Sequence, residues 1–284
     1  MWALARLYSL WVGNELPPLE WSCLHSLAKA GHDLTLFTYD EIEAVPPGVT
    51  RADAELIMPR HEVFSNRGKR VTFAGFSNVF RYRLLSMNDG VWVDCDLVSG
   101  GKEWCPSTYE YGWEDSEAIN TAVLGLPRDS ELLQELIASA ESRSKQSFTW
   151  GQLGPKLFSE LASGKPEVLA RAKPSQFFYS LHYSSTWKLF HPGYVEEIQR
   201  LRTDSVFVHL WSNVIKNAPP AVASRWPPAG SFLDYLYRDA GLEKPVGKRT
   251  PLWMIWLWAL RLNGRRFLRQ KWRAIVRGGS VSRA

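Results

Sequence analysis

A short segment around residue 90 constrains the fold of this 284-residue chain more than any other. Residues 77–87 have the pattern of a helix, Asp89-Gly90 that of a turn, and residues 91–98 that of a buried strand carrying Asp94 and Asp96. Alternation along a strand points these two carboxylates to one side. Neighbouring carboxylates at the end of an apolar strand are costly unless positive charge lies beside them. The sequence therefore predicts a cation there, and a divalent cation with oxygen ligands is the commonest solution.

The elements around this segment predict an α/β fold. Residues 6–12 have the pattern of a strand, residues 19–30 that of a helix closed by Gly31, and residues 34–39 that of a second strand. A strand, helix and strand in this order predict parallel pairing. Further predicted elements are strands within 117–126 and 205–211 and helices over 130–143 and 155–162. Loops are predicted at 45–58, with one short turn of helix, and at 100–118. Ligands of such a sheet bind at the carboxyl ends of its strands.

The residues of the first segment also resemble those of a known family. Ser77-Asn78-x-x-Arg81-Tyr82-x-x-Leu85, followed by Gly90-x-Trp92-x-Asp94-x-Asp96, is similar to the GT-A-fold sugar transferases with a DXD motif. The similarity is to the branch that includes bacterial capsule and lipopolysaccharide transferases and the alpha-1,4-galactosyltransferases. Asp89 stands where that branch usually has a glycine. The resemblance extends from the first strand to His209-Leu210-Trp211.

The resemblance implies a GT-A (Rossmann-like) fold with a mixed, mostly parallel sheet flanked by helices. It also implies a metal-dependent glycosyltransferase that moves a sugar from a nucleotide-sugar, a UDP-sugar by analogy, to a saccharide or lipid-linked acceptor. Retention of anomeric configuration and a role in bacterial surface polysaccharide synthesis follow from the same likeness. The expected cofactor is a divalent cation, Mn²⁺ or Mg²⁺.

Site residues are carried over from the resemblance position by position. The expected metal residues are Asp96, Asp94 and His209: Asp96 as the direct ligand, Asp94 through the ribose or a water-mediated contact with the metal, and His209 as the residue that completes the metal or diphosphate site. Arg81 is expected to assist departure of the diphosphate. Asn78 and Asn120 are expected to contact the sugar, and Trp11 the uracil face, where stacking on a base is worth about 1–3 kcal/mol. The other expected donor-binding residues are Gly13, Tyr39, Trp92 and Trp211. Glu114 and Asp115 are candidates for a carboxylate on the acceptor side.

Two other functions fit parts of the sequence. A buried strand ending in Asp-x-Asp also opens the haloacid-dehalogenase phosphatases, in which the first Asp is a nucleophile. Those enzymes place the motif near the N-terminus and follow it with a paired acidic motif, whereas here the motif begins at Asp94 and no acidic pair follows. The second alternative is a catalytically inactive module that binds a nucleotide-sugar at the membrane.

Charge divides the chain at residue 247. Ten of its 34 Lys and Arg residues and none of its 29 Asp and Glu residues follow that position. We therefore expect a transferase domain at 1–247 and a basic, Trp-rich helical tail at 248–284. Tryptophans beside clustered cations favour an anionic membrane surface as the partner of residues 250–277, and no nucleic-acid recognition motif accompanies the charge. A C-terminal helix docked on the body through its aromatic residues is the alternative.

Cellular location is an expectation drawn from absent signals. Cys23, Cys95 and Cys105 have no metal-binding or disulfide spacing, which fits a reducing compartment. The N-terminus lacks the pattern of a signal peptide, and no apolar run is long enough to span a bilayer. The expected location is cytoplasmic, peripheral on the inner face of a bacterial cytoplasmic membrane.

Overall fold

The computed structural model describes residues 5–65, 72–243 and 247–264 and divides the chain into two compact units. The first unit comprises residues 1–180 and 201–209, and the second comprises residues 181–200 and 210–284. The units are defined by contacts within the chain, and their boundaries differ from the change in charge at residue 247. The division into a transferase domain at 1–247 and a tail at 248–284 stays a prediction.

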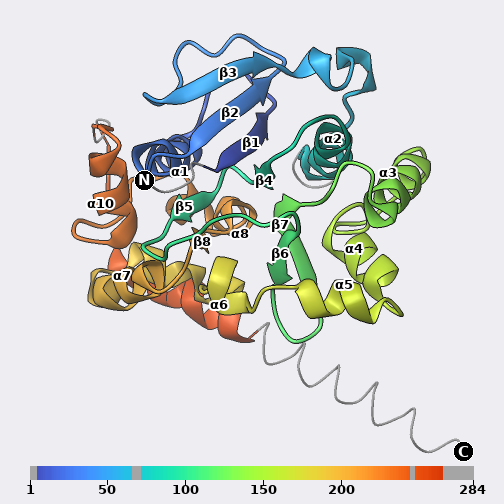
Figure 1. Cartoon of the computed structure of the whole chain (residues 1–284). Helices are drawn as coiled ribbons and strands as arrows, with labels where there is room; N and C mark the ends of the chain where they lie inside the picture. The colour runs from blue at the N-terminus through green and yellow to red at the C-terminus, as the bar shows by residue number, and fades with distance from the viewer. Residues whose placement is uncertain (1–4, 66–71, 244–246, 265–284) are drawn as a thin grey trace, which may run out of the picture. The chain divides into compact units, whose positions relative to one another are not determined.

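A six-stranded sheet with the order β3-β2-β1-β4-β7-β6 forms the centre of the first unit (Figure 1). Strands β1, β2, β3 and β4 pair in parallel, and β7 and β6 continue the sheet antiparallel. A separate antiparallel pair joins β5 to β8. The strands are β1 Arg6–Trp11, β2 Asp33–Thr38, β3 Val49–Asp53, β4 Val91–Val93, β5 Leu97–Ser99, β6 Glu110–Trp113, β7 Ile119–Gly125 and β8 Phe207–His209. The predicted mixed, mostly parallel sheet flanked by helices is confirmed.

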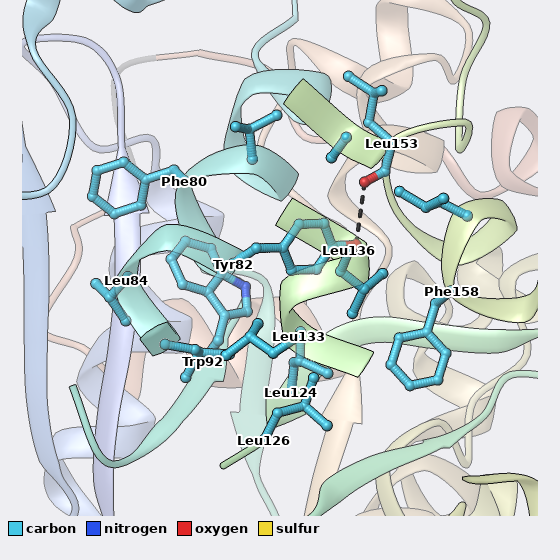
Figure 2. Close-up of a cluster of buried hydrophobic side chains, with 14 of the residues drawn as sticks. Phe80, Tyr82, Leu84, Trp92, Leu124, Leu126, Leu133, Leu136, Leu153 and Phe158 are labelled. Carbon is cyan, nitrogen blue, oxygen red and sulfur yellow. Dashed lines mark hydrogen bonds between the residues drawn. The ribbon is translucent and has the colours of Figure 1, made fainter. Parts of the chain in front are cut away.

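Both faces of this sheet are buried because apolar side chains occur at consecutive strand positions. Along β4, Val91 and Val93 join the core that also contains helix α1, whereas Trp92 joins the core on the other face with α2, α3 and α4. Figure 2 shows Trp92 among the apolar side chains of that second core, where the Tyr82 hydroxyl donates to the Leu153 carbonyl at 3.1 Å. The helices of the unit are α1 Pro18–Lys29, η1 Ala54–Leu56, η2 Arg60–Glu62, α2 Ala74–Met87, α3 Glu131–Ser144, α4 Pro155–Ala162, α5 Pro166–Arg171 and α6 Ser175–Phe178.

Three predictions about local structure are wrong. The strand predicted over 91–98 is two strands in different sheets, β4 and β5, separated by a turn that holds Asp94 and Asp96. Buried bonds fix that break, since the Ser9 hydroxyl donates to the Val93 carbonyl at 2.6 Å and the Asp94 amide donates to the Ala122 carbonyl at 2.8 Å. The loops predicted at 45–58 and 100–118 contain the short strands β3 and β6.

The second unit is helical and has a buried carboxylate at its centre. Asp234 is fully buried and accepts hydrogen bonds from the Trp226 indole at 3.1 Å and from the Gly230 amide at 3.0 Å. Arg249 at 2.6 Å and Arg238 at closer range pair with the same carboxylate. The start of the basic tail is therefore joined to residues 226–238. The helices are η3 Tyr183–Phe190, η4 Pro192–Tyr194, α7 Val195–Thr203, which crosses the boundary between the units, α8 Ser212–Lys216, α9 Pro220–Ala223 and α10 Phe232–Asp239.

Residues 252–264 form a helix of the second unit with two different sides. Ile255, Trp258 and Ala259 are buried on one side, and the Trp258 ring lies edge-on to Phe190 with 5.5 Å between centroids. The large exposed side chains on the other side are Leu252, Trp253, Trp256, Leu257 and Leu260. No described helix is long and apolar enough to cross a membrane. The part of the predicted membrane segment after residue 264 lies outside the described residues.

Candidate functional site

Asp94, Asp96 and His209 lie together in the first unit. One potential ligand atom from each lies within 4.8 Å of those from the other two. Asp94 and Asp96 follow β4 directly, at the edge where the parallel strands β1, β2 and β4 have their carboxyl ends. His209 ends β8 and pairs with Leu97 of β5, which places its ring beside Asp96. Long-range pairing of β5 with β8 therefore completes the cluster.

The two carboxylates differ in exposure. The Asp96 carboxylate is buried and lies 3.1 Å from Nε2 of His209, whose side chain is also buried. The side chain of Asp94 is 29% exposed, so the cluster is open to solvent on its side. Two oxygen donors and one imidazole nitrogen are a ligand set that suits Mn²⁺ or Mg²⁺. The residues present therefore fit the divalent cation that the resemblance implied.

Electrostatics favour a positive ion among these groups. Burial raises the pKa of Asp94, Arg81 lowers it, and Asp96 raises it again, so that the net shift is upward. Burial by itself lowers the pKa of His209, but the neighbouring Asp96 outweighs burial and holds that pKa above its usual value. Burial acts in opposite directions on the two groups, and what the shifts share is the negative charge of Asp96 beside each of them. A divalent cation would stabilise both carboxylates in their charged form.

The residues expected around the donor sugar are buried beside this cluster. Arg81 forms an ion pair with Asp94, with 2.9 Å between Nη2 and Oδ1. The Asn78 amide donates to the Ala74 carbonyl at 2.7 Å and packs so closely on Gly154 that a Cβ there would lie 2.3 Å from Oδ1. Asn120 donates to the Glu114 carboxylate at 2.8 Å. The structure thus brings Arg81 to the carboxylates and gives all three side chains protein partners.

The two acidic residues considered for the acceptor side have different surroundings. One oxygen of Asp115 accepts the amides of Glu117 and Ala118, at 2.8 and 3.0 Å, and so shapes the turn between β6 and β7. Glu114 lies at the end of β6 and is held through its contact with Asn120. Of the two carboxylates, Glu114 is the one whose position is set by a residue expected to contact the sugar.

The residues expected to bind the nucleotide lie at neighbouring strand ends. Trp11 ends β1, and its indole donates to the Glu15 carbonyl at 2.8 Å. Gly13 has φ of +136°, which only glycine adopts readily, and a Cβ there would lie 3.4 Å from the Trp11 indole nitrogen. Tyr39 packs edge-on against Phe80 and donates its hydroxyl to the Met58 carbonyl at 2.8 Å. Trp11 and Gly13 therefore belong to a compact turn at the sheet edge, whereas the Tyr39 ring packs against the hydrophobic core.

Two tryptophans expected at the site have other surroundings. Trp92 is 1% exposed, and its indole donates to Asp94 at 2.7 Å. Trp211 belongs to the second unit, has a left-handed backbone with φ of 58°, and donates its indole to the Leu181 carbonyl at 2.7 Å. The predictions did not single out Thr121, although its backbone and hydroxyl oxygens both accept from Arg81. Its place one residue after Asn120 was the available signal.

Comparison with known proteins bears on the family of the chain, because the matched residues do not include Asp94 or Asp96. Residues 126–227, which include His209, match a family model described as the alpha 1,4-glycosyltransferase conserved region. Comparison with curated proteins gave no match. Among solved structures the chain is similar to "PaToxG Glycosyltransferase", with 11% identity, a TM-score of 0.43, and coverage of 58% of this chain and 72% of that one. This structural similarity is too distant to bear on the chemistry, so the family match carries the assignment. Over residues 126–227 the chain is therefore similar to the family that the sequence predicted, the glycosyltransferases of the alpha-1,4-galactosyltransferase type.

Proposed function

We propose that the chain is a metal-dependent glycosyltransferase that uses a nucleotide-sugar, in particular a UDP-sugar, as donor. The observation that carries this proposal is the cluster of Asp94, Asp96 and His209 at the carboxyl edge of the sheet. Asp96 and His209 would hold the cation from the buried side and Asp94 from the open side. When bound, a divalent cation neutralises the charge that develops on a departing diphosphate.

The transfer exchanges one bond to the sugar for another. The bond between the anomeric carbon and the diphosphate oxygen breaks, and its electron pair leaves with the nucleoside diphosphate. The oxygen of an acceptor hydroxyl forms the new bond, and its proton passes to a departing diphosphate oxygen. If the acceptor attacks the anomeric carbon from the same face of the sugar that the diphosphate leaves, the configuration is retained and no protein nucleophile is required. Asn120 and Glu114 would border the sugar, and a saccharide or lipid-linked acceptor in bacterial surface polysaccharide synthesis completes the proposal.

A donor screen tests this function. The purified chain is incubated with Mn²⁺ and a panel of nucleotide-sugars, and release of the nucleoside diphosphate is measured with and without EDTA. We expect release that depends on Mn²⁺ and favours a uridine donor, with NMR of the product giving the retained anomer. Binding of UDP without any release would instead identify an inactive module. The family match over residues 126–227 supports a glycosyltransferase over the phosphatase alternative.

We also propose an anionic membrane surface as a partner, with a peripheral position on the cytoplasmic face. The support is the exposed side of the helix at 252–264, where five large apolar side chains recur with helical spacing. The chain that follows this helix is rich in Arg and Lys and has no acidic residue, which matches anionic headgroups. The other side of the helix packs within its own unit through Ile255, Trp258 and Ala259. Trp256, one of the five exposed side chains, also contacts Trp187 and His191, with 5.3 and 5.0 Å between centroids.

Replacing Trp253, Leu257 and Leu260 together with Ser is expected to weaken binding to vesicles that contain phosphatidylglycerol by about 100-fold or more. Burial of each such side chain in lipid contributes about 1.5–3 kcal/mol, and every 1.4 kcal/mol is tenfold in affinity. Leu56→Ser, at a side chain of the first unit that is 68% exposed, is the matched control. Co-sedimentation measures the effect. Unchanged binding of the triple variant would contradict the proposal, and a lipid-independent dimer that the triple variant abolishes would assign this face to a second copy.

A further inference from the structure

The guanidinium of Arg81 is fully engaged inside the protein. Its side chain is 4% exposed, and each of its three nitrogen atoms has a partner. Nε donates to the Ser77 carbonyl at 3.3 Å, and Nη1 donates to the carbonyl and, at 3.2 Å, to the hydroxyl of Thr121. Nη2 donates to the Ser77 hydroxyl at 3.2 Å and pairs with Asp94 at 2.9 Å. A guanidinium held in this way has no nitrogen left for a diphosphate unless several contacts break.

The side chains of Arg81 and Trp92 both contact the same oxygen of Asp94, Oδ1. The Trp92 indole donates to Oδ1 of Asp94 at 2.7 Å, and Arg81 pairs with the same atom. The guanidinium carbon of Arg81 lies 4.9 Å from the centroid of the Trp92 ring, so the two donors also support each other. Within the described part of the chain, no hydrogen bond or ion pair involves Oδ2 of Asp94. One oxygen of the carboxylate is thus fixed by the protein, and the other remains for a ligand.

The anchoring of Trp92 makes this arrangement rigid. Its ring is 1% exposed and lies among the apolar side chains around Phe80 and Tyr82 (Figure 2). A buried indole keeps its orientation because rotation would displace its neighbours. A carboxylate held by such a partner binds a cation without first losing its rotational freedom.

We propose that Arg81, together with Trp92, is a positioning residue that holds Asp94 through Oδ1 and so presents Oδ2 to the divalent cation. Arg81 then acts on the metal site through Asp94 and does not bind the diphosphate of the donor. This assignment rests on the proposed metal site. It replaces the role that the family resemblance implied for Arg81, in which the guanidinium assists departure of the diphosphate.

The two roles of Arg81 predict different effects on metal affinity without nucleotide. Residues that orient metal ligands typically change affinity by about 10- to 100-fold when replaced. We expect Arg81→Lys and Trp92→Phe each to weaken Mn²⁺ binding within that range, as measured from the EPR signal of free Mn²⁺ in the absence of any nucleotide. At Mn²⁺ concentrations that saturate each variant, KM for the nucleotide-sugar should return to within about twofold of the wild-type value, because the diphosphate contacts are intact.

Arg83→Lys is the matched control. Arg83 lies on the same helix, pairs with Glu62 and Glu141 at 2.9 and 2.6 Å, and has no contact with the carboxylate cluster. We expect its Mn²⁺ affinity to equal that of the wild type. Trp92→Phe removes the indole donor without altering a charge, so it decides the question if Arg81→Lys fails to fold, as judged by circular dichroism of the metal-free protein.

The outcomes separate this inference from the proposed function. Wild-type Mn²⁺ affinity in both Arg81→Lys and Trp92→Phe, with KM raised at saturating Mn²⁺ in Arg81→Lys, would overturn the positioning role and restore the diphosphate contact. Asp96→Asn serves as the reference for the metal site itself. If that variant binds Mn²⁺ as the wild type does, the metal site is wrong and the role of Arg81 falls with it. If it does not, the metal site stands and the Arg81 and Trp92 variants alone decide.

Discussion

Replacing Asp96 with Asn is expected to lower kcat/KM for sugar transfer by about 1,000-fold or more. Asp96 is buried, contacts His209, and is the most enclosed member of the candidate metal cluster. Asn keeps the shape of the side chain but removes the charge that attracts the cation. Loss of a Lewis acid removes several kcal/mol of stabilisation, and each 1.36 kcal/mol is a factor of ten in rate. Steady-state kinetics with the donor identified in the screen measure the effect.

Asp89→Asn is the control for this variant. Asp89 lies just before strand β4, is 74% exposed, and pairs with Arg128 at the surface. Since surface ion pairs are worth about 0–1 kcal/mol, we expect its activity to remain within about twofold of the wild type. Thermal unfolding of the metal-free proteins shows whether Asp96→Asn retains the fold. A folded Asp96→Asn variant with more than a tenth of wild-type activity would rule out its role as a ligand of a catalytic cation.

Asp234→Asn is expected to lower the free energy of unfolding by about 3 kcal/mol, because it breaks a buried ion-paired network. Asp234 is fully buried and joins Arg249, Arg238, the Trp226 indole and the Gly230 amide. An amide side chain would turn one acceptor into a donor that faces positive charge. Urea denaturation followed by tryptophan fluorescence measures the change. Asp239→Asn, at an exposed position of the same helix, should change stability by less than about 0.5 kcal/mol.

The same carboxylate gives a dependence on pH. Burial by itself raises the pKa of Asp234, but the bonds from Arg249, Gly230, Trp226 and Arg238 outweigh it and hold that pKa below its usual value. A lowered pKa in the folded state adds stability above the pKa of the unfolded state. That stability is lost as pH falls through the folded pKa. We therefore expect the difference between wild type and Asp234→Asn to vanish in acid, and a difference that stays constant with pH would contradict this account.

Secondary structure followed the sequence where local signals were strong. The helix predicted over 155–162 has these bounds in the structure, since a proline stands at its first position and its apolar residues face the core. The strand β3 was taken for a loop because two prolines and a glycine precede it and another proline follows at residue 59. The break between β4 and β5 has no local signal, because tertiary hydrogen bonds to Val93 and Asp94 produce it.

The candidate site shows the same limit. The sequence predicted that Asp94 and Asp96 act together, and they do lie together, although a turn and not an extended strand places them there. His209 joins them through the pairing of β5 with β8, a contact between residues far apart in the chain that only the family resemblance suggested. The family resemblance placed Arg81 near the site but did not distinguish a phosphate ligand from the partner of Asp94. Side-chain geometry makes that distinction.

The most direct test of the metal site is calorimetric titration of UDP into the wild-type chain and into the double variant Asp94→Asn/Asp96→Asn, each with Mn²⁺ and with EDTA. Asp94 and Asp96 supply both carboxylates of the cluster, so the double variant leaves only His209 to hold an ion. We predict that Mn²⁺ strengthens UDP binding to the wild type and has no effect on UDP binding to the double variant. Equal strengthening of UDP binding by Mn²⁺ in both proteins would contradict a cation held by Asp94 and Asp96.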